Sequence, residues 1–397
     1  MLSSQHRAIV KSTVPLLESG GEALATHFYQ KLLNEHPEVR PLFNQAHQES
    51  GRQPRALANG VLMYARHIDE LEQLGDLVAK IINKHVALNI QPEHYPIVGD
   101  CLLASIREVL GSQIATDEVI EAWGAAYGQL ADILIGLEKN LYDAKADAPG
   151  GWRGTRPFRI ASKVVESNEI TSFHLIPVDG GEVLGFEPGQ YIGLRLTIDG
   201  QEVRRNYSLS ALSNGSEYRI SVKREPEGKV STYLHDRIHV GDVLDVLPPA
   251  GDFTLKKTAE HNARPLVLLS GGAGITPMIT MLHGALATGR PVYFIHSARH
   301  IGVHAFRDKI DALARQHPQL RIFSCYQRDD TDRPAASHLG EIDQSLLESW
   351  LPATRDIDVY FVGPVAFMRA MRKHVKAMGV ADAQIHYEFF GPAVAMD

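Results

Sequence analysis

Residues 266–277 have the sequence LVLLSGGAGITP, an apolar run followed directly by a glycine turn and the start of a helix. A strand, a tight turn and a helix in this order are typical of parallel α/β folds, where the turn brings backbone N–H groups to a phosphate. The stretch lacks the Lys-Ser or Lys-Thr pair that closes a Walker loop, and it lacks the third glycine of the usual dinucleotide fingerprint. It therefore predicts either a nucleotide-binding turn or a glycine turn that only packs.

The same alternation continues on the C-terminal side of this stretch. Strand-like runs occupy residues 266–270, 292–297, 321–326 and 359–362. Helical stretches such as 278–287 and 365–377 lie between and after them. Strands that alternate with helices predict a parallel sheet with helices on both faces, so we expect an α/β domain over residues 261–397.

Residues 156–260 show a different rhythm, with short strand-like runs in which apolar and polar residues alternate. The runs lie at residues 158–165, 172–178, 191–198, 218–223 and 243–247. Glycine and proline separate them, as in Pro188-Gly189 and in the Pro-Pro-Ala-Gly sequence of residues 248–251. This pattern predicts a small antiparallel β-barrel.

The first 142 residues are predicted to be helical. Apolar positions recur at helical spacing in two sets, Leu74, Val78, Ile81, His85 and Leu88, and Tyr127, Ala131, Leu134 and Glu138. Residues 143–155 are rich in Ala, Asp, Pro and Gly, which is the composition of a linker. We therefore expect a multidomain chain with an all-α domain at 1–142, a linker at 143–155, the β-barrel at 156–260 and the α/β domain at 261–397.

Length and composition exclude several classes of protein. The chain has 397 residues, too many for one ordinary core, and its 44% hydrophobic and 22% charged residues are those of a soluble globular protein. The net charge of -7 argues against nucleic acid as a partner. Cys101 and Cys325 lie in separate apolar runs, so we expect both to be reduced and buried. No signal peptide begins at Met1 and no run approaches the ~20 apolar residues of a membrane span, so we expect a cytoplasmic protein without membrane insertion.

A histidine, a carboxylate and a tyrosine in the helical region are candidates for a metal centre. His85 lies on the apolar stripe of its helix, where a lone histidine is more often a hydrogen-bonded core residue than a ligand. Glu138 also lies on an apolar stripe, and a buried carboxylate is costly unless it is paired or hydrogen-bonded. Tyr95 opens the helix between them. If Tyr95 and Glu138 both reach His85, the carboxylate accepts the Nδ1 proton and makes a metal-bound imidazole more electron-rich.

Tyr29 is the second candidate in this region. It borders the apolar face of a helix expected at about residues 21–34. A phenol hydroxyl in an apolar pocket can donate a hydrogen bond to bound O2. The alternative is that Tyr29 is an ordinary packed aromatic residue.

The helical region resembles the globin domain of the flavohaemoglobins over essentially its whole length, and the resemblance implies a b-type haem. It implies that His85 is the proximal ligand of the haem iron and that Tyr95 and Glu138 form the proximal relay. It also places Lys84 between the haem and a flavin.

On the opposite face of the haem, the resemblance implies that Tyr29 is the distal tyrosine and Gln53 the distal glutamine. It implies that Phe43, in the corner Arg-Pro-Leu-Phe of residues 40–43, packs against the haem plane. Pro54 departs from the family pattern and bears on how Gln53 points. The role of Tyr29 does not depend on Pro54.

The sequence Arg205-Asn206-Tyr207-Ser208 ends a strand-like stretch, so Arg205 and Tyr207 are expected on one face of the strand. A guanidinium group there suits a phosphate, an aromatic ring suits a flavin, and Ser208 could hydrogen-bond the reactive edge of the flavin. Taken alone, these four residues fit a plain barrel strand equally well.

Two further motifs flank this strand at the positions found in ferredoxin-reductase-like flavin domains. Gly189-Gln190-Tyr191 lies upstream, and Gly228-Lys229-Val230-Ser231 lies downstream, just before a helix whose N–H groups suit a pyrophosphate. This resemblance implies FAD, held by Tyr191, Arg205, Asn206, Tyr207, Ser208, Gly228, Val230 and Ser231.

The glycine turn after residue 270 resembles the nicotinamide motif of the same reductases. The resemblance implies an NAD(P)H site formed by Gly271, Gly272, Ala273, Gly274, Ile275, Thr276 and Pro277. The later Gly363-Pro364-Val365 also matches, but Val362 replaces the cysteine that usually precedes it. Ser297 and Arg299 are either surface residues or contacts of the ribose phosphate of NADPH, whereas the family generally favours NADH.

The C-terminal residues 387–392 are expected to form a final strand beside the flavin. The resemblance assigns cofactor contacts there to Glu388, Phe389, Phe390, Gly391 and Pro392. It implies that Phe390 covers the flavin and excludes water, and that Glu388 points towards the hydride-transfer centre.

The resemblance implies a nitric oxide dioxygenase that passes electrons from NAD(P)H through FAD to haem and oxidises NO to nitrate with O2. Three alternatives stay open: a gas sensor or store with its own reductase, a flavin reductase whose helical domain mediates protein contacts, and a haem peroxidase activity. Because the three cofactor sites lie in series on one chain, we expect a monomer with O2, NO and NAD(P)H as its small-molecule partners.

Overall fold

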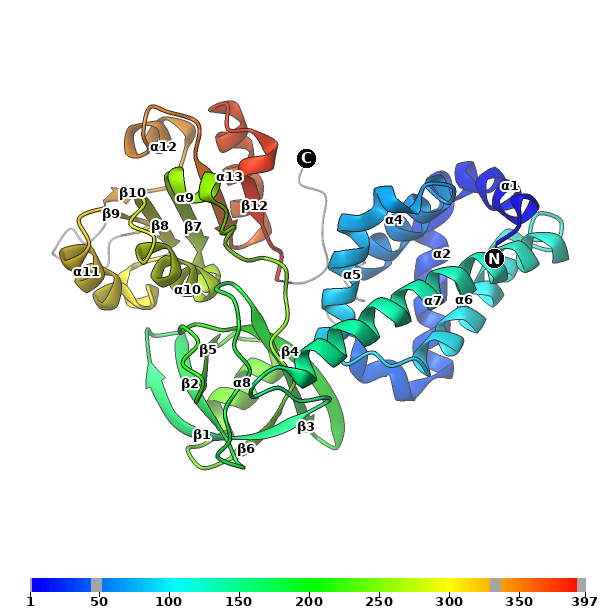
Figure 1. Cartoon of the computed structure of the whole chain (residues 1–397), viewed down its shortest axis with the longest axis horizontal. Helices are drawn as coiled ribbons and strands as arrows, with labels where there is room; N and C mark the ends of the chain where they lie inside the picture. Colours follow the sequence, from blue (N-terminus) through cyan, green and yellow to red (C-terminus); the bar gives the residue numbers. More distant parts are fainter. Residues whose placement is uncertain (1, 44–51, 329–336, 391–397) are drawn as a thin grey trace.

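The computed structural model describes residues 2–43, 52–328 and 337–390, apart from the side chains of Arg52, Gln53 and Asn262. A helical domain, an antiparallel β-barrel and an α/β domain follow one another along the chain (Figure 1). This order confirms the fold class expected from the sequence. The domain boundaries at residues 142, 155 and 260 stay predictions.

The helical domain consists of α1 (Ser4–Ser12), α2 (Val14–Glu35), η1 (Pro37–Leu42), α4 (Arg52–Arg66), η2 (Leu71–Leu74), α5 (Gly75–Ala87), α6 (His94–Leu110) and α7 (Asp117–Asp147). Local sequence explains where several of them begin. The side chains of Ser3 and Thr116 accept hydrogen bonds from His6 N and Val119 N, which caps α1 and α7. Pro15 lies in the first turn of α2, where a missing N–H group costs little.

Helix α2 is longer than expected. The sequence predicts a helix at about residues 21–34, but α2 begins at Val14 and continues through Gly20 and Gly21. Two glycines weaken an isolated helix. Here Gly21 is buried against α4, and a Cβ atom at this position would be in ordinary van der Waals contact with Ala58, at 3.6 Å. Close packing between α2 and α4 therefore overrides the low helix propensity.

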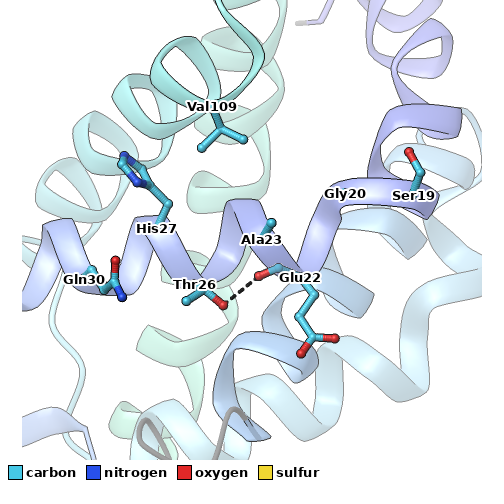
Figure 2. Close-up of a pocket in the computed structure, with 8 residues that line it drawn as sticks. All are labelled: Ser19, Gly20, Glu22, Ala23, Thr26, His27, Gln30 and Val109. Atoms are coloured by element: carbon cyan, nitrogen blue, oxygen red, sulfur yellow. Dashed lines mark hydrogen bonds between the residues drawn. The ribbon is translucent and has the colours of Figure 1, made fainter.

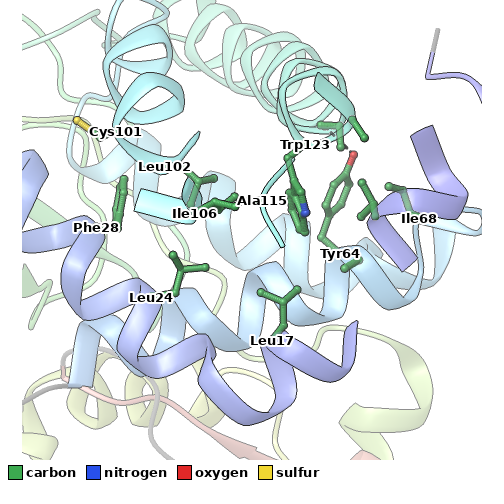
Figure 3. Packing of buried hydrophobic residues seen from close by; sticks show 14 of the residues in the cluster. Leu17, Leu24, Phe28, Tyr64, Ile68, Cys101, Leu102, Ile106, Ala115 and Trp123 are labelled. Carbon is green, nitrogen blue, oxygen red and sulfur yellow. Dashed lines mark hydrogen bonds between the residues drawn. The ribbon is translucent and has the colours of Figure 1, made fainter. Parts of the chain in front are cut away.

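The core of the helical domain lies between α2, α4, α6 and α7. Figure 3 shows Leu17, Leu24 and Phe28 of α2 on the same cluster as Leu102 and Ile106 of α6. Trp123 of α7 packs into this cluster, and Tyr64 donates a hydrogen bond of 2.8 Å to the Ala126 carbonyl. These contacts hold α2 and α7, which carry candidate site residues, in fixed positions.

The barrel consists of β1 (Arg156–Val165), β2 (Ile170–Pro177), β3 (Tyr191–Ile198), β4 (Gln201–Ser208), β5 (Tyr218–Lys223), α8 (Lys229–Asp236) and β6 (Val243–Val246). Its strands pair antiparallel in the order β4-β3-β6-β1-β2-β5. An isolated bridge between Leu209, next to β4, and Ile220 of β5 brings the two edges of the sheet together. Closing the edges in this way protects strands that would otherwise expose unpaired backbone groups.

The α/β domain consists of α9 (Ala259–Ala263), β7 (Leu266–Gly271), η3 (Gly272–Gly274), α10 (Ile275–Leu286), β8 (Val292–Ala298), η4 (Ile301–Val303), α11 (Arg307–Gln316), β9 (Leu320–Tyr326), β10 (His338–Leu339), α12 (Gln344–Trp350), β11 (Asp358–Val362), α13 (Val365–Ala377), η5 (Asp382–Gln384) and β12 (Ile385–Tyr387). The sheet is parallel, in the order β10-β9-β8-β7-β11-β12. Leu266 and Leu268 of β7 belong to the core under α10, whereas Val267 and Leu269 belong to the core under α13. Both faces of the sheet are covered, as expected.

The final strand lies earlier than expected. The sequence predicts a strand at residues 387–392, but β12 spans Ile385–Tyr387, and Glu388 follows it. Strand β12 pairs with β11 through Ile385 opposite Val359 and Tyr387 opposite Phe361, one residue before β11 ends at Val362. The aromatic run Tyr-Glu-Phe-Phe therefore starts at the end of the sheet and does not form a strand of its own.

The helical domain and the barrel are joined by α7, which runs from one towards the other (Figure 1). Helix α7 continues to Asp147 and so extends into the expected linker of residues 143–155. Lys145 donates a hydrogen bond to the Pro249 carbonyl of the barrel, and Trp152 donates one of 3.1 Å to Val246 O. Contacts with the barrel explain why a stretch of linker composition is ordered here. Across the described residues, none of the helices has the length and apolar character needed to cross a bilayer.

Candidate functional site

Three polar side chains from three helices meet in the helical domain. His85 of α5 lies with its Nδ1 atom 2.7 Å from Glu138 Oε1 and 3.2 Å from the Tyr95 hydroxyl. Tyr95 of α6 donates a hydrogen bond of 2.6 Å to the same oxygen of Glu138. The Glu138 side chain is only 3% exposed. The three residues that the sequence proposed as a relay are therefore in direct contact.

This arrangement fixes which nitrogen of His85 can bind a metal. Because a carboxylate accepts at Nδ1, the proton of a neutral His85 lies on Nδ1 and the lone pair lies on Nε2. Burial, together with the hydrogen bond to Glu138, raises the pKa of Tyr95 far above its ordinary range, so its hydroxyl keeps its proton. A histidine with Nδ1 held and Nε2 available fits the proximal side of an iron porphyrin.

Two further tyrosines support this network. Tyr127 donates a hydrogen bond of 2.6 Å to the backbone carbonyl of Tyr95, and Tyr142 donates one of 2.8 Å to Ile90 O. From the sequence, Tyr127 was expected only as a position on an apolar stripe, and no role was predicted for Tyr142. The signal was available, because Tyr127, Glu138 and Tyr142 share one face of α7 at helical spacing.

Tyr29 and Phe43 lie together on another side of the helical domain. Tyr29 is 8% exposed, and its ring makes edge contacts with Phe28 and Phe43 at centroid distances of 5.0 and 5.6 Å. The side chain of Gln53, at the start of α4, lies outside the described part of the chain. The structure thus brings together two of the three residues expected on the distal side, in aromatic surroundings.

The candidate flavin residues lie on the adjacent strands β3 and β4. Tyr191 pairs with Ser208, and Ile192 pairs with Tyr207. Since paired residues of an antiparallel sheet share a face, Tyr191 and Ser208 lie on one face, and Tyr207 and Arg205 lie on the other. Burial lowers the pKa of Arg205 and raises that of Tyr207. The predicted shared face of Arg205 and Tyr207 agrees with this register.

The segment before α8 has the geometry of an anion site. Gly228 is the N-cap residue, and α8 begins without a side-chain cap, which leaves its first N–H groups available. Ser231 donates a hydrogen bond of 3.1 Å to Gly228 O and accepts one of 3.2 Å from Glu225 N. A Cβ atom on residue 228 would lie 2.4 Å from Ser231 Oγ, so only glycine fits. This cradle fits the pyrophosphate of FAD.

The glycine turn after β7 has features of both alternatives from the sequence, a turn that packs and a turn that binds a nucleotide. Gly274 packs tightly, since a Cβ atom there would lie 2.0 Å from the Val362 carbonyl oxygen. Gly272 has a positive φ of 53° and open space around its Cβ position. Ile275 and Pro277 are buried in the apolar core, so they can offer a nucleotide only their backbones. Gly274 therefore serves packing, and the turn at Gly272 is accessible to a ligand.

The end of α5 rests directly on the barrel, two residues after His85. A Cβ atom on Gly193 of β3 would lie 2.8 Å from Ala87 O, and Ala87 packs with Tyr191 and Ala250. Arg204 of β4 donates a hydrogen bond to the Leu88 carbonyl, at the C-terminal end of α5. This contact between α5 and the barrel could not be predicted, because neither Gly193 nor Arg204 belongs to a recognised motif.

The C-terminal segment places an ionisable side chain, Glu388, within electrostatic reach of α5. Burial and the nearby Asp252 raise the pKa of Glu388 to about 8, while Lys84 of α5 lowers it. Lys84 itself is exposed, Phe389 packs on the core under α13, and Phe390 is 49% exposed. Gly391 and Pro392 lie outside the described residues. Lys84 is therefore close enough to Glu388 to act on its charge, and the position of Lys84 between haem and flavin stays a prediction.

A shallow hollow on the outer face of α2 lies apart from these groups (Figure 2). It is lined by Ser19, Gly20, Glu22, Ala23, Thr26, His27, Gln30 and Val109. None of these is a candidate site residue, and the hollow contains no constellation that would bind a cofactor. Both cysteines are free and buried, as expected.

Three family models match the chain in succession. The globin model matches residues 26–134, the oxidoreductase FAD-binding domain residues 157–255, and the oxidoreductase NAD-binding domain residues 268–373. Relatives cover the whole chain. The flavohemoproteins of Burkholderia sp. (strain TH2) and Pseudomonas aeruginosa are 68% and 63% identical to it, in each case over 100% of both chains.

Solved structures agree with these matches. The flavohemoglobin of Malassezia yamatoensis, with bound FAD and haem, superimposes with a TM-score of 0.85 at 28% identity and covers 98% of this chain and 100% of its own. The FAD/NAD-binding domain of the nitric oxide dioxygenase from Vibrio cholerae is 41% identical, with a TM-score of 0.55 over 60% of this chain and 100% of its own.

Proposed function

The chain belongs to the flavohaemoglobin family, and we propose that it is a nitric oxide dioxygenase. It is an oxidoreductase whose cofactors are haem, FAD and NAD(P)H. The proposed reaction consumes NO and O2 and yields nitrate. When bound, NAD(P)H would supply a hydride to FAD, and FAD would pass its two electrons one at a time to the haem and release the proton to solvent. The name of the V. cholerae relative supports this proposal.

The contact of His85 with Glu138 is the observation that carries the proposal. Glu138 Oε1 lies 2.7 Å from His85 Nδ1, so the carboxylate can hold the Nδ1 proton and draw it away from the ring. A more electron-rich imidazole favours oxygen activation over reversible oxygen storage. A store or sensor does not need a buried carboxylate at this position, and burying one without a catalytic benefit is costly.

The remaining candidate residues have binding and orienting roles. Tyr29 supplies a hydroxyl donor towards the oxygen substrate from aromatic surroundings, where water competes little. Arg205 and the N–H groups around Gly228 supply positive potential for the phosphates of FAD. Because all three sites lie on one chain, we propose that the monomer is sufficient for electron transfer.

The test is NADH consumption by the purified, cofactor-loaded chain under air, with and without NO. We expect NO to accelerate NADH consumption, and we expect each NO consumed to yield one nitrate. If NO leaves the rate of NADH consumption unchanged, gas storage or sensing becomes the better description.

Tyr29→Phe is the matched variant for this test. We expect it to speed O2 release and to depress NO turnover on the order of 100-fold, the usual effect of losing one donor to a developing charge. Flavin reduction by NADH should stay intact, because Tyr29 lies in the helical domain. Unchanged O2 release would remove Tyr29 from the proposed role.

A further inference from the structure

Three side chains with different ligand atoms converge outside the haem network. Glu35 ends α2, His36 follows it, and Cys101 lies in α6. A carboxylate oxygen, an imidazole nitrogen and the thiol sulfur of these residues all lie within 4.8 Å of one another. Oxygen, nitrogen and sulfur donors in one cluster are the ligand set of zinc sites.

The backbone holds two of these ligands in place. His36 caps α2, with its N–H group donating to Leu32 O at 3.0 Å, and Pro37 prevents the helix from continuing. Cys101 is only 2% exposed. Its sulfur points away from the rest of the apolar cluster in Figure 3. A buried thiol directed at a carboxylate and an imidazole is not explained by core packing.

The imidazole of His36 has the second partner that metal-bound histidines usually have. Its Nδ1 atom lies 3.0 Å from Glu38 Oε1. A metal bound at Nε2 keeps this hydrogen bond, which orients the ring and fixes its tautomer. A metal bound at Nδ1 instead brings the Glu38 carboxylate within reach as a fourth ligand.

The charges around the cluster also suit a cation. Lys31 Nζ lies 3.0 Å from Glu35 Oε1 and 2.9 Å from Glu108 Oε1, so the Glu35 carboxylate is already paired with a cation. If a metal replaces Lys31 at Glu35, Lys31 keeps its bond to Glu108. Exposed ion pairs contribute little to stability, so this exchange has a small cost.

We propose that Glu35, His36 and Cys101 form a binding site for a thiolate-preferring divalent cation, with Zn2+ as the best fit. Binding replaces the thiol proton of Cys101 with the metal and releases that proton to solvent, which makes the affinity rise with pH. The metal would tie the end of α2, the helix of Tyr29, to α6, the helix of Tyr95. The proposal is independent of the proposed function.

The test is titration of the haem- and FAD-loaded full chain with Zn2+, and with Co2+ as a spectroscopic probe. We expect one equivalent to bind, and Co2+ to give a thiolate-to-metal charge-transfer band. His36→Gln and Glu35→Gln change partly exposed residues, so folding should be preserved, and each should weaken Zn2+ binding at least about tenfold.

Cys101→Ser and Cys325→Ser form the matched pair of cysteine variants. Cys325 is equally buried and lies in the α/β domain, so its loss should leave the Co2+ band and the Zn2+ affinity unchanged. Loss of the band in Cys101→Ser alone supports the site. Zn2+ affinity that is the same in wild type, His36→Gln and Glu35→Gln, or a charge-transfer band that follows Cys325, overturns the proposal.

Discussion

Two carboxyl groups, Glu138 in the helical domain and Glu388 after the α/β domain's last strand, have different surroundings. Glu138 is enclosed in the helical domain and receives hydrogen bonds at one oxygen from His85 and Tyr95. Glu388 lies just past the last strand of the α/β domain, where burial and Asp252 raise its pKa to about 8 against the opposing effect of Lys84. Glu138 thus accepts two hydrogen bonds in a fixed geometry, whereas Glu388 is kept protonated at neutral pH.

The difference shows how environment selects the chemistry of a carboxyl group. A carboxyl that accepts from two donors can hold a proton on its neighbour and tune that neighbour. A carboxyl whose pKa is raised by burial stays neutral, and it would add no negative charge beside a flavin if it lies there as proposed. The first role depends on hydrogen-bond geometry and the second on charge, so different substitutions should separate them.

Glu138→Gln should have the larger effect. The uncharged amide oxygen is a weaker acceptor than the carboxylate, so it draws the Nδ1 proton of His85 less strongly and holds the Tyr95 hydroxyl less tightly. We expect NO turnover to fall about 10- to 100-fold, the range seen when such a partner of a metal ligand is removed. O2 binding should change much less. Stopped-flow measurement of turnover and of O2 affinity on the same protein checks both.

Asp132→Asn is the control, because Asp132 is an exposed carboxylate on the same helix. It should behave as wild type. Equal NO turnover in wild type and Glu138→Gln would show that contact between His85 and Glu138 does not tune the iron.

Glu388→Gln should have a smaller effect that depends on pH. In the wild type, Glu388 becomes charged as the pH rises through about 8, which should slow flavin reduction because the reduced flavin gains negative charge. The glutamine variant should keep its neutral-pH rate above pH 8. Flavin bleaching by NADH distinguishes the two profiles when it is measured from about pH 6 to about pH 10, roughly two units on either side of the Glu388 pKa.

Stability gives an independent readout of the same group. Because the folded-state pKa of Glu388 is raised, its contribution to the free energy of unfolding is fully present below its ordinary pKa and is lost as the pH rises towards about 8. The glutamine variant should lack this loss. Glu348→Gln, at an exposed position in α12, is the control, and a wild-type pH profile in Glu388→Gln would contradict the assignment.

Much of the fold could be predicted because the spacing of apolar residues and the positions of glycine and proline indicate helices, strands and turns locally. The alternation of strands and helices after residue 261 was sufficient to predict a parallel sheet covered on both faces. Helix α2 and strand β12 were misplaced because tertiary packing decides their ends: α4 stabilises the glycine-containing turn of α2, and β11 sets the length of β12.

The candidate site was predictable only where chemistry makes a residue unusual in its helix. Glu138 stood out because a carboxylate on an apolar stripe requires a partner, and that partner is His85. Arg204 and Gly193 carried no such signal. Their contacts with Leu88 and Ala87 join segments more than a hundred residues apart, which neither periodicity nor a short motif encodes.

Lys84→Met should have the smallest effect, and it tests directly whether the two carboxyl groups are linked by charge. Lys84 adjoins His85 in α5 and lowers the pKa of Glu388, so it connects the two regions by charge alone. Removing its charge should move the pH midpoint of the flavin-reduction rate upward from about 8, since a nearby cation favours the ionised carboxyl. Lys80→Met, which removes an exposed lysine from the same helix, should leave the midpoint in place. A downward shift in Lys84→Met, or equal shifts in both variants, would mean that Lys84 does not act on Glu388, and the two carboxylates would then work independently.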